Sequence, residues 1–301
     1  MKENLAALVT ESRNPSSSHI DTLDTRSILS IINQEDARVA QSVAKSIPHI
    51  ADCVDAITKS FASGGRLIYV GAGTSGRLGV LDASECPPTY GTAPEQVVGV
   101  IAGGKQAVFS AVENAEDNPS AGTEDLKTLG VNKDDVIVGI AASGRTPYVL
   151  GAMEYAKSKG AKVGAVCCNA GCAMAEMADF PMIAVVGPEV VTGSSRMKAG
   201  TAQKLILNML TTAAMIRSGK VYGNLMVDVE ATNAKLRERQ IRIVMDATGC
   251  DEDQALNALT STGLHCKTAI LTILADCSPD TAREALASHK GFVRAALKAL
   301  L

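Results

Sequence analysis

The chain has 301 residues, a formal net charge of −3 at pH 7 and an apolar fraction of 46%. With five Tyr, four Phe and no Trp, it lacks the basic surface and the stacking side chains typical of nucleic-acid-binding proteins. No apolar run approaches the ~18 residues of a membrane span, and the short apolar patch Leu5–Val9 is too brief for an export signal. We therefore expect a cytoplasmic protein whose partner is a small molecule, with no nucleic acid and no membrane involved.

The cysteines and histidines do not form a metal-binding pattern. In a large chain without an export signal, reduced thiols are the expectation for the eight cysteines. Cys167, Cys168 and Cys172 are clustered, but the cluster lacks the paired spacing and the histidines of a zinc site. The four histidines are scattered along the chain. We expect neither a metal nor another cofactor.

The N-terminal part predicts a polar arm followed by helices. Residues 1–20 are polar and contain Asn14-Pro15, which favours an extended arm. A helical pattern begins after Asp24, whose carboxylate suits an N-cap. A second helix is predicted to begin near Pro48 and to end at Ser63-Gly64-Gly65.

Five short apolar runs then alternate with helical stretches. The runs are Leu67–Gly71, Val97–Ile101, Val136–Ile140, Val163–Val166 and Met182–Val186. The segments between them are long enough for crossover helices. This alternation predicts a parallel sheet with helices on both faces.

The rest of the chain is predicted to be helical. Long helices are expected over Ser195–Ser218 and roughly Asp228–Ala247, and only short helices follow Gly249. We place the short helices at Glu252–Thr262, His265–Asp276, Pro279–Ser288 and Phe292–Leu300. The expected organisation is one large domain over 1–245, including the N-terminal helical arm, and a small helical domain over 246–301.

Three loops at the expected carboxyl edge of the sheet suit a phosphate group. Ligands of open parallel sheets bind at this edge, and the loops after the first, third and fifth runs each combine glycine, hydroxyls and an arginine before a helix. The candidate substrate-binding residues are Gly73, Thr74, Ser75, Ser143, Arg145, Thr146, Ser194, Ser195 and Arg196. Close backbone approach, helix N-terminal amides and hydroxyls all bind phosphate oxygens. One such loop could be a simple helix cap, but three at one edge favour a phosphate site.

The first loop also matches the G-x-G-x-x-G dinucleotide fingerprint. A nicotinamide site needs an acidic residue ~20 positions further on, at the end of the second strand. That strand is followed here by Ala102-Gly103-Gly104-Lys105, which contains no acid. The sequence therefore favours a phosphomonoester over a dinucleotide.

Two acidic segments supply candidate acids and bases. Glu85 precedes Pro87-Pro88, which we expect to end its helix. A carboxylate at a helix C-terminus faces the negative end of the helix dipole, which favours the protonated form that a general acid needs. The second segment is Glu113–Asp117, after the second strand; its composition alone favours a solvated helix end.

With these residues in view, the sequence closely resembles the N-acetylmuramic acid 6-phosphate etherases of the sugar isomerase (SIS) domain superfamily. The resemblance covers nearly the whole chain. Its most specific stretches are Gly71–Gly79, Leu81–Tyr90, Gly139–Tyr148, Val191–Lys204 and Asn224–Val229.

The resemblance implies a flavodoxin-like, doubly wound sheet of five parallel strands, a ubiquitin-associated-like helical tail and a homodimer. It also implies a lyase that cleaves the D-lactyl ether of N-acetylmuramic acid 6-phosphate, in peptidoglycan recycling. The family's proton donor falls on Glu85 and its second acid–base residue on Glu116. Many members have glycine where Asn114 stands, and Asn tolerates a left-handed backbone better than most residues.

Several alternatives stay open at this point. The lactyl carboxylate would need a cation, and the candidates are Arg77, Arg145, Arg196, Lys198 and Lys204. A non-catalytic sugar-phosphate sensor, similar to the vertebrate glucokinase-regulating proteins, is one alternative function. An aldose–ketose isomerase on the same fold is the other.

Overall fold

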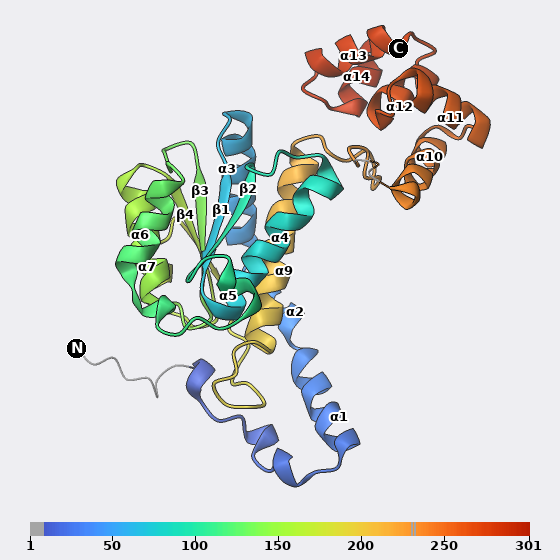
Figure 1. The fold of residues 1–301 in the computed structure, drawn as a ribbon. Helices are drawn as coiled ribbons and strands as arrows, with labels where there is room; N and C mark the ends of the chain where they lie inside the picture. Colours follow the sequence, from blue (N-terminus) through green and yellow to red (C-terminus); the bar gives the residue numbers. More distant parts are fainter. Residues whose placement is uncertain (1–8, 230, 232) are drawn as a thin grey trace. The chain divides into compact units, whose positions relative to one another are not determined.

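The computed structural model describes residues 9–229, 231 and 233–301 (Figure 1). The chain divides into two compact units. The first comprises the described residues up to Ser84 together with Glu95–Thr211, and the second comprises Glu85–Pro94 and Thr212–Leu301. The domain boundary at residue 245 remains a prediction from the sequence.

The first unit is built on a five-stranded parallel sheet, which confirms the predicted fold class. The strands are β1 (Leu67–Gly71), β2 (Val97–Ile101), β3 (Val136–Ile140), β4 (Lys162–Cys167) and β5 (Phe180–Ile183). Their order in the sheet is β2-β1-β3-β4-β5, and every neighbouring pair is parallel. The register aligns the last residues of β1, β2 and β3, so the loops that follow them leave the sheet at the same edge.

The fifth strand begins and ends earlier than predicted. Gly164 of β4 pairs with Phe180, and the last rung joins the N–H of Ala184 to the carbonyl oxygen of Cys167. Beyond that point β4 offers no further partner, and Val185 is 43% exposed. The apolar run Met182–Val186 therefore marks the end of the strand rather than its full length.

Helices cover both faces of the sheet, as predicted. Because strand side chains alternate between faces, Ile68 packs with Tyr148 and Met153 of α7 (Pro147–Ser158). Tyr69 points the other way, and its hydroxyl donates to Asp82 of α4 (Gly73–Tyr90) at 2.9 Å. Figure 1 shows α6 (Pro119–Thr128) beside α7, and α4 beside α9 (Lys198–Arg217).

The described part of the N-terminal arm is not extended. It forms three 3-10 turns, Val9–Glu11, Pro15–Ser17 and Ile20–Thr22. The arm is held because the side chain of Asn169, just after β4, accepts the N–H of Val9 at 2.9 Å and donates to the carbonyl oxygen of Ala142 at 3.0 Å. The extended conformation predicted for this segment was wrong, because the hydrogen-bond partner that holds the turns, Asn169, lies about 160 residues away in the sequence.

The N-terminal helices largely follow the prediction. Asp24 caps α1 (Thr25–Asp36) by accepting the N–H of Ser27 at 3.1 Å. The short α2 (Val39–Ala44) was not expected, and α3 (Ile47–Ala62) ends at the predicted serine.

The second unit contains the helical tail. Its helices are α10 (Ala234–Thr248), α11 (Glu252–Ser261), α12 (Cys266–Leu274), α13 (Pro279–Ser288) and α14 (Val293–Leu300). The first of these begins later than expected, because Asn233 caps it by accepting the N–H of Leu236 at 2.9 Å. None of the helices in the described ranges has both the length and the apolar character needed to cross a bilayer.

Candidate functional site

The first predicted loop forms the amino end of α4. Gly73 has a φ of 52°, and a Cβ on Gly71 would lie 2.7 Å from the backbone nitrogen of Gly76. Glycine is therefore required where β1 turns into the helix. The first amides of a helix have no intrahelical acceptor, so this end can donate to an anion.

Thr74 and Ser75 have different environments in that loop. Thr74 is half-buried and faces α9, since a Cβ on Gly200 would lie 3.5 Å from its methyl carbon. Ser75 is buried, and its hydroxyl donates to the side-chain oxygen of Gln203 at 3.0 Å. The proton of Ser75 is therefore engaged in joining α4 to α9, whereas Thr74 is the better placed of the two to contact a ligand.

The second loop leads from β3 into α7. Gly144 has a φ of 72°, and the N–H of Arg145 donates to the hydroxyl oxygen of Ser143 at 3.4 Å. Thr146 occupies the N-cap position of α7, where its side chain makes no capping hydrogen bond. Ser143, Arg145 and Thr146 are all half-buried. Since β1 and β3 are neighbours, this loop leaves the sheet beside the first one.

The third loop differs from the other two, because the amino end of α9 is already occupied by a carboxylate. Glu189 is 1% exposed, and it accepts the N–H of Lys198 at 3.0 Å and that of Ala199 at 2.9 Å. These amides are thus not offered to a phosphate. The half-buried Ser194 and Ser195 hydroxyls and the exposed Arg196 remain as candidates. Sequence reasoning missed Glu189 because it lies nine residues before Lys198, outside the N-cap and first-turn positions at which an acid indicates the start of a helix.

Lys198 is excluded as the cation for a substrate carboxylate. Its side chain is 3% exposed, and its ammonium lies 2.5 Å from a carboxylate oxygen of Glu35, which is itself 6% exposed. The same oxygen of Glu35 accepts a hydrogen bond from the side chain of Asn14 at 3.0 Å. The lysine therefore neutralises a buried acid between α1 and α9.

Glu116 lies beside the first loop. It belongs to a 3-10 turn (Ala115–Asp117) that begins after Asn114, whose φ of 60° confirms the expected left-handed backbone. A cavity is lined by Gly73, Arg77 and Glu116 together with the residues preceding the turn. The structure therefore brings Glu116 together with the amino end of α4, and Arg77 is the cation in this cavity lining.

Glu85 does not lie at a helix C-terminus, so this expectation was wrong. α4 continues through Pro87 and Pro88 to Tyr90, and it ends where Gly91 adopts a φ of 57°. Prolines remove bonds to the preceding turn but allow the residues after them to continue it; the N–H of Gly91 still donates to the carbonyl oxygen of Pro87 at 2.9 Å. Glu85 is exposed and belongs to the second unit, whereas Glu116 belongs to the first.

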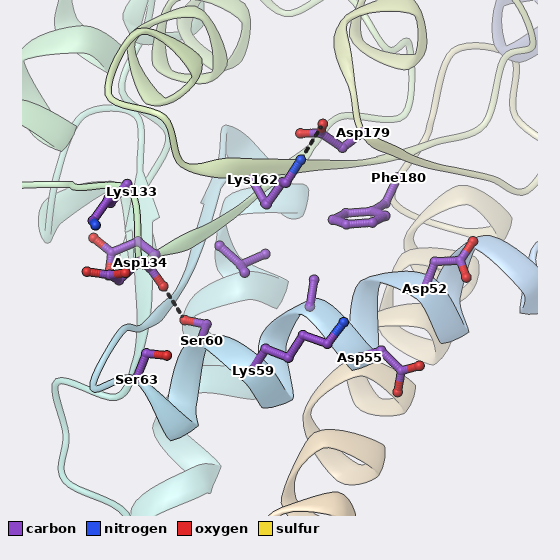
Figure 2. A pocket seen from close by; sticks show the side chains of 13 residues that line it. Asp52, Asp55, Lys59, Ser60, Ser63, Lys133, Asp134, Lys162, Asp179 and Phe180 are labelled. Atoms are coloured by element: carbon purple, nitrogen blue, oxygen red, sulfur yellow. Dashed lines mark hydrogen bonds and ion pairs between the residues drawn. The ribbon is translucent and has the colours of Figure 1, made fainter.

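A second cavity lies at the opposite edge of the sheet. Figure 2 shows that it is lined by acidic and basic side chains around the starts of β3, β4 and β5. Five of the lining residues are aspartates and three are lysines. One pair, Lys162 and Asp179, is already joined at 3.3 Å. Because acids outnumber bases, this cavity suits a phosphate less well than the carboxyl edge does. Within the described ranges, no three His, Cys, Asp or Glu side chains are arranged to hold a metal ion.

Comparison with known families agrees with this architecture. Residues 116–213 match the SIS domain, and residues 49–157 match the glucokinase regulatory protein N-terminal SIS domain.

Several curated proteins are similar over their whole length. The chain is 64% identical over 297 residues to N-acetylmuramic acid 6-phosphate etherase 2 of Vibrio parahaemolyticus, with 99% of each chain covered. It is 65% identical to the N-acetylmuramic acid 6-phosphate etherase of Aliivibrio fischeri, again with 99% of each covered. The protein of that name from Photorhabdus laumondii is 63% identical over 300 residues and is covered completely. At this identity and coverage, the chain belongs to the N-acetylmuramic acid 6-phosphate etherase family.

Proposed function

We propose that the chain cleaves the D-lactyl ether of N-acetylmuramic acid 6-phosphate, giving N-acetylglucosamine 6-phosphate and D-lactate in peptidoglycan recycling. The observation that carries this function is the identity of 62–65% to proteins of that name over essentially the whole chain. The phosphate-suited loops and the acid at the same sheet edge agree with it.

The reaction needs proton transfers at defined positions. In the open-chain sugar, the hydrogen on carbon 2 lies beside the aldehyde and is acidified by it. A base removes this proton, and the lactyl oxygen leaves carbon 3 with a proton from an acid. Water then adds to the unsaturated aldehyde, so the new hydroxyl on carbon 3 comes from solvent. Each positioned proton transfer contributes ~10²–10⁴-fold to the rate.

Glu116 and Glu85 are the proposed acid–base residues. Glu116 handles the carbon-2 proton or the incoming water, and its place in the cavity beside the amino end of α4 supports this role. Glu85 protonates the departing lactate. Support for Glu85 comes from the family resemblance of the Leu81–Tyr90 stretch alone, because Glu85 lies within α4 and not at its end.

The phosphate binds at the amino end of α4 and the loop of Ser143 and Thr146. Support comes from the contrast with α9, whose first amides are engaged by Glu189. Arg77 is the proposed cation for the lactyl carboxylate, since it lines the same cavity as Glu116 and its Nε is oriented by a 3.0 Å hydrogen bond to the carbonyl oxygen of Val108.

We further propose that the protein acts in the cytoplasm as a homodimer, without a metal or another cofactor. A phosphorylated sugar is an intracellular metabolite because its charge hinders passage through a bilayer. The homodimer rests on the family resemblance alone.

Release of D-lactate by the purified full chain, treated with a chelator, tests the proposal. We expect lactate from the wild type and from Asp117→Asn, whose exposed carboxylate lies in the same turn as Glu116 but outside the cavity lining. Glu116→Gln should lower kcat by ~10²–10⁴-fold. A folded chain that binds the sugar phosphate without releasing lactate would instead be a sensor, the function suggested by the glucokinase regulatory match at residues 49–157. An isomerised sugar without lactate would indicate an aldose–ketose isomerase.

Isotope exchange separates the two acids. In deuterated water, Glu85→Ala should retain exchange at carbon 2 of the product sugar phosphate while losing etherase turnover. If the variant loses both, the division of roles between Glu85 and Glu116 is wrong.

A further inference from the structure

Two cysteines of the cluster noted in the sequence lie directly beneath one of the proposed phosphate loops. Cys167 is the last residue of β4, and Cys172 precedes the short helix α8 (Ala173–Met177). Their sulfurs are hydrogen-bonded at 3.3 Å. Cys167 is 0% exposed and Cys172 is 7% exposed, so a small reagent would reach the pair through Cys172.

The pair is in contact with the backbone of the loop. A Cβ on Gly144 would lie 2.1 Å from the sulfur of Cys172 and 3.3 Å from the Cβ of Cys167. The carbonyl oxygen of Gly144 accepts the N–H of Met174 at 3.0 Å, which ties the loop to α8. A displacement of Cys172 is therefore transmitted to Gly144, with no empty space to absorb it.

The two thiols differ in reactivity. The hydrogen bond with Cys167 lowers the pKa of Cys172, against the effect of burial, and a backbone hydrogen bond with Ala175 lowers it further. The pKa of Cys167 is raised by the same sulfur–sulfur hydrogen bond and by burial. Because the thiolate is the nucleophile, Cys172 attacks an oxidant first. Burial raises the pKa of the neighbouring Cys168 to about 12, so that thiol is unreactive.

We propose that Cys167 and Cys172 are a redox modification site, which forms a reversible disulfide with a peroxide and thereby shifts the Ser143–Thr146 loop. The thiolate of Cys172 attacks one peroxide oxygen and becomes a sulfenic acid, the O–O bond breaks, and the departing hydroxide takes a proton from solvent to give water. The thiol of Cys167 then attacks the sulfenic sulfur, forming the S–S bond and releasing a second water. Two thiols are oxidised and one peroxide is reduced to two waters. A thiol reductant restores the pair.

Closure of the bond should alter substrate binding. A disulfide holds its sulfurs about 2.05 Å apart, so the two must approach by roughly 1 Å from the reduced geometry. Gly144 and the Ser143 and Thr146 donors move with Cys172. This consequence rests on the proposed function, since it assumes that the loop binds the sugar phosphate; the disulfide itself does not.

The test uses the full chain with the two half-exposed thiols removed by Cys250→Ser and Cys277→Ser. Stoichiometric hydrogen peroxide is added, and trypsin, which cuts after Lys162 and after Arg196, releases the peptide Val163–Arg196, which contains Cys167, Cys168 and Cys172. We expect a loss of about 2 Da from this peptide, reversed by dithiothreitol. Cys168→Ser should keep the mass change and Cys172→Ser should abolish it. The proposed site would be wrong if the mass loss persisted in Cys172→Ser, if it disappeared in Cys168→Ser, or if peroxide caused no mass change at all.

Kinetics test the coupling to the loop. The oxidised form should show a KM for the sugar phosphate raised several-fold with a smaller change in kcat, and Cys172→Ser should be insensitive to peroxide. A disulfide that forms without any change in KM would overturn the coupling. Absence of etherase activity before peroxide is added is a failure of the proposed function, and the mass measurement still decides the disulfide.

Discussion

The buried ion pair between Glu35 and Lys198 gives a quantitative prediction. Both side chains are almost completely buried, at 6% and 3% exposure, and their charged atoms lie 2.5 Å apart. Removing one partner of a buried pair leaves an uncompensated charge and destabilises a protein by ~3–5 kcal/mol. The carboxylate of Glu35 would keep its 3.0 Å hydrogen bond from Asn14 and its 3.4 Å ion pair with the exposed Arg38. We therefore expect Lys198→Met to lower the free energy of unfolding by about 3 kcal/mol, the lower end of that range.

Replacing both partners should have a much smaller effect. In the double variant Glu35→Leu/Lys198→Met both charges of the pair are absent, and Asn14 keeps its 3.1 Å hydrogen bond to the carbonyl oxygen of Pro188. Substitution of a buried pair by apolar side chains is often close to neutral. We expect the double variant to lose about 1 kcal/mol.

Urea unfolding followed by circular dichroism measures these differences. Lys204→Met is the matched control, because Lys204 is an exposed lysine of the same helix, and it should change the free energy of unfolding by less than about 0.5 kcal/mol. A loss of under about 1 kcal/mol for Lys198→Met would contradict the expected cost of leaving the buried charge of Glu35 without Lys198. A double variant less stable than Lys198→Met would contradict it as well.

The remaining predictions concern pH and backbone geometry. Burial opposes ionisation of Glu35, but the hydrogen bonds from Lys198 and Asn14 outweigh it, so the folded pKa of Glu35 lies below the ordinary value of 4.5. The stability that Glu35 contributes should therefore be complete above pH 4.5 and should be lost as the pH falls through the folded pKa. Acid titration should show that Glu35→Leu/Lys198→Met lacks this loss. Asn114 has a left-handed backbone, so Asn114→Ala should destabilise the protein by ~1 kcal/mol and lower kcat, whereas Asn114→Gly should retain kcat. Equal kcat values for the two variants in steady-state assays would show that the turn does not position Glu116. Gly122→Ala should destabilise the α6–α7 contact, because its Cβ would lie 2.0 Å from the carbonyl oxygen of Tyr148, and an unchanged urea midpoint would contradict that packing.

The regular parts of the fold could be predicted because local signals agree with tertiary structure. Three strands, β1, β2 and β3, have the predicted bounds, because in each the apolar run and the paired segment coincide. Asp24 caps α1 as predicted because a helix N-cap depends on neighbours only a few residues away. The shorter β5 could not be foreseen, because its length is set by where β4 ends.

The candidate site was predictable only where chemistry follows local backbone geometry. The left-handed Asn114 and the glycine-rich start of α4 can be expected from their own sequences. The burial of Lys198 against Glu35 could not, since the two residues are far apart in the sequence and only the packed arm brings them together. The hydrogen bonds from the first amides of α9 to Glu189 could not be predicted either, because Glu189 lies nine residues before the helix. The end of α4 was predicted too early, because Pro87 and Pro88 lie in the last turn of the helix and allow it to continue to Tyr90.

In the proposed reaction the ether bond is broken at carbon 3 of the sugar by elimination, and water is then added at the same carbon. Turnover of N-acetylmuramic acid 6-phosphate in ¹⁸O-labelled water, with both products analysed by mass spectrometry, tests it most directly. We expect one ¹⁸O atom at carbon 3 of N-acetylglucosamine 6-phosphate, beyond any exchange at the aldehyde oxygen, and none from the cleavage step in D-lactate, because lactate keeps the ether oxygen. Label introduced into the lactate hydroxyl, with none at carbon 3, would contradict it and place the bond cleavage on the lactyl side.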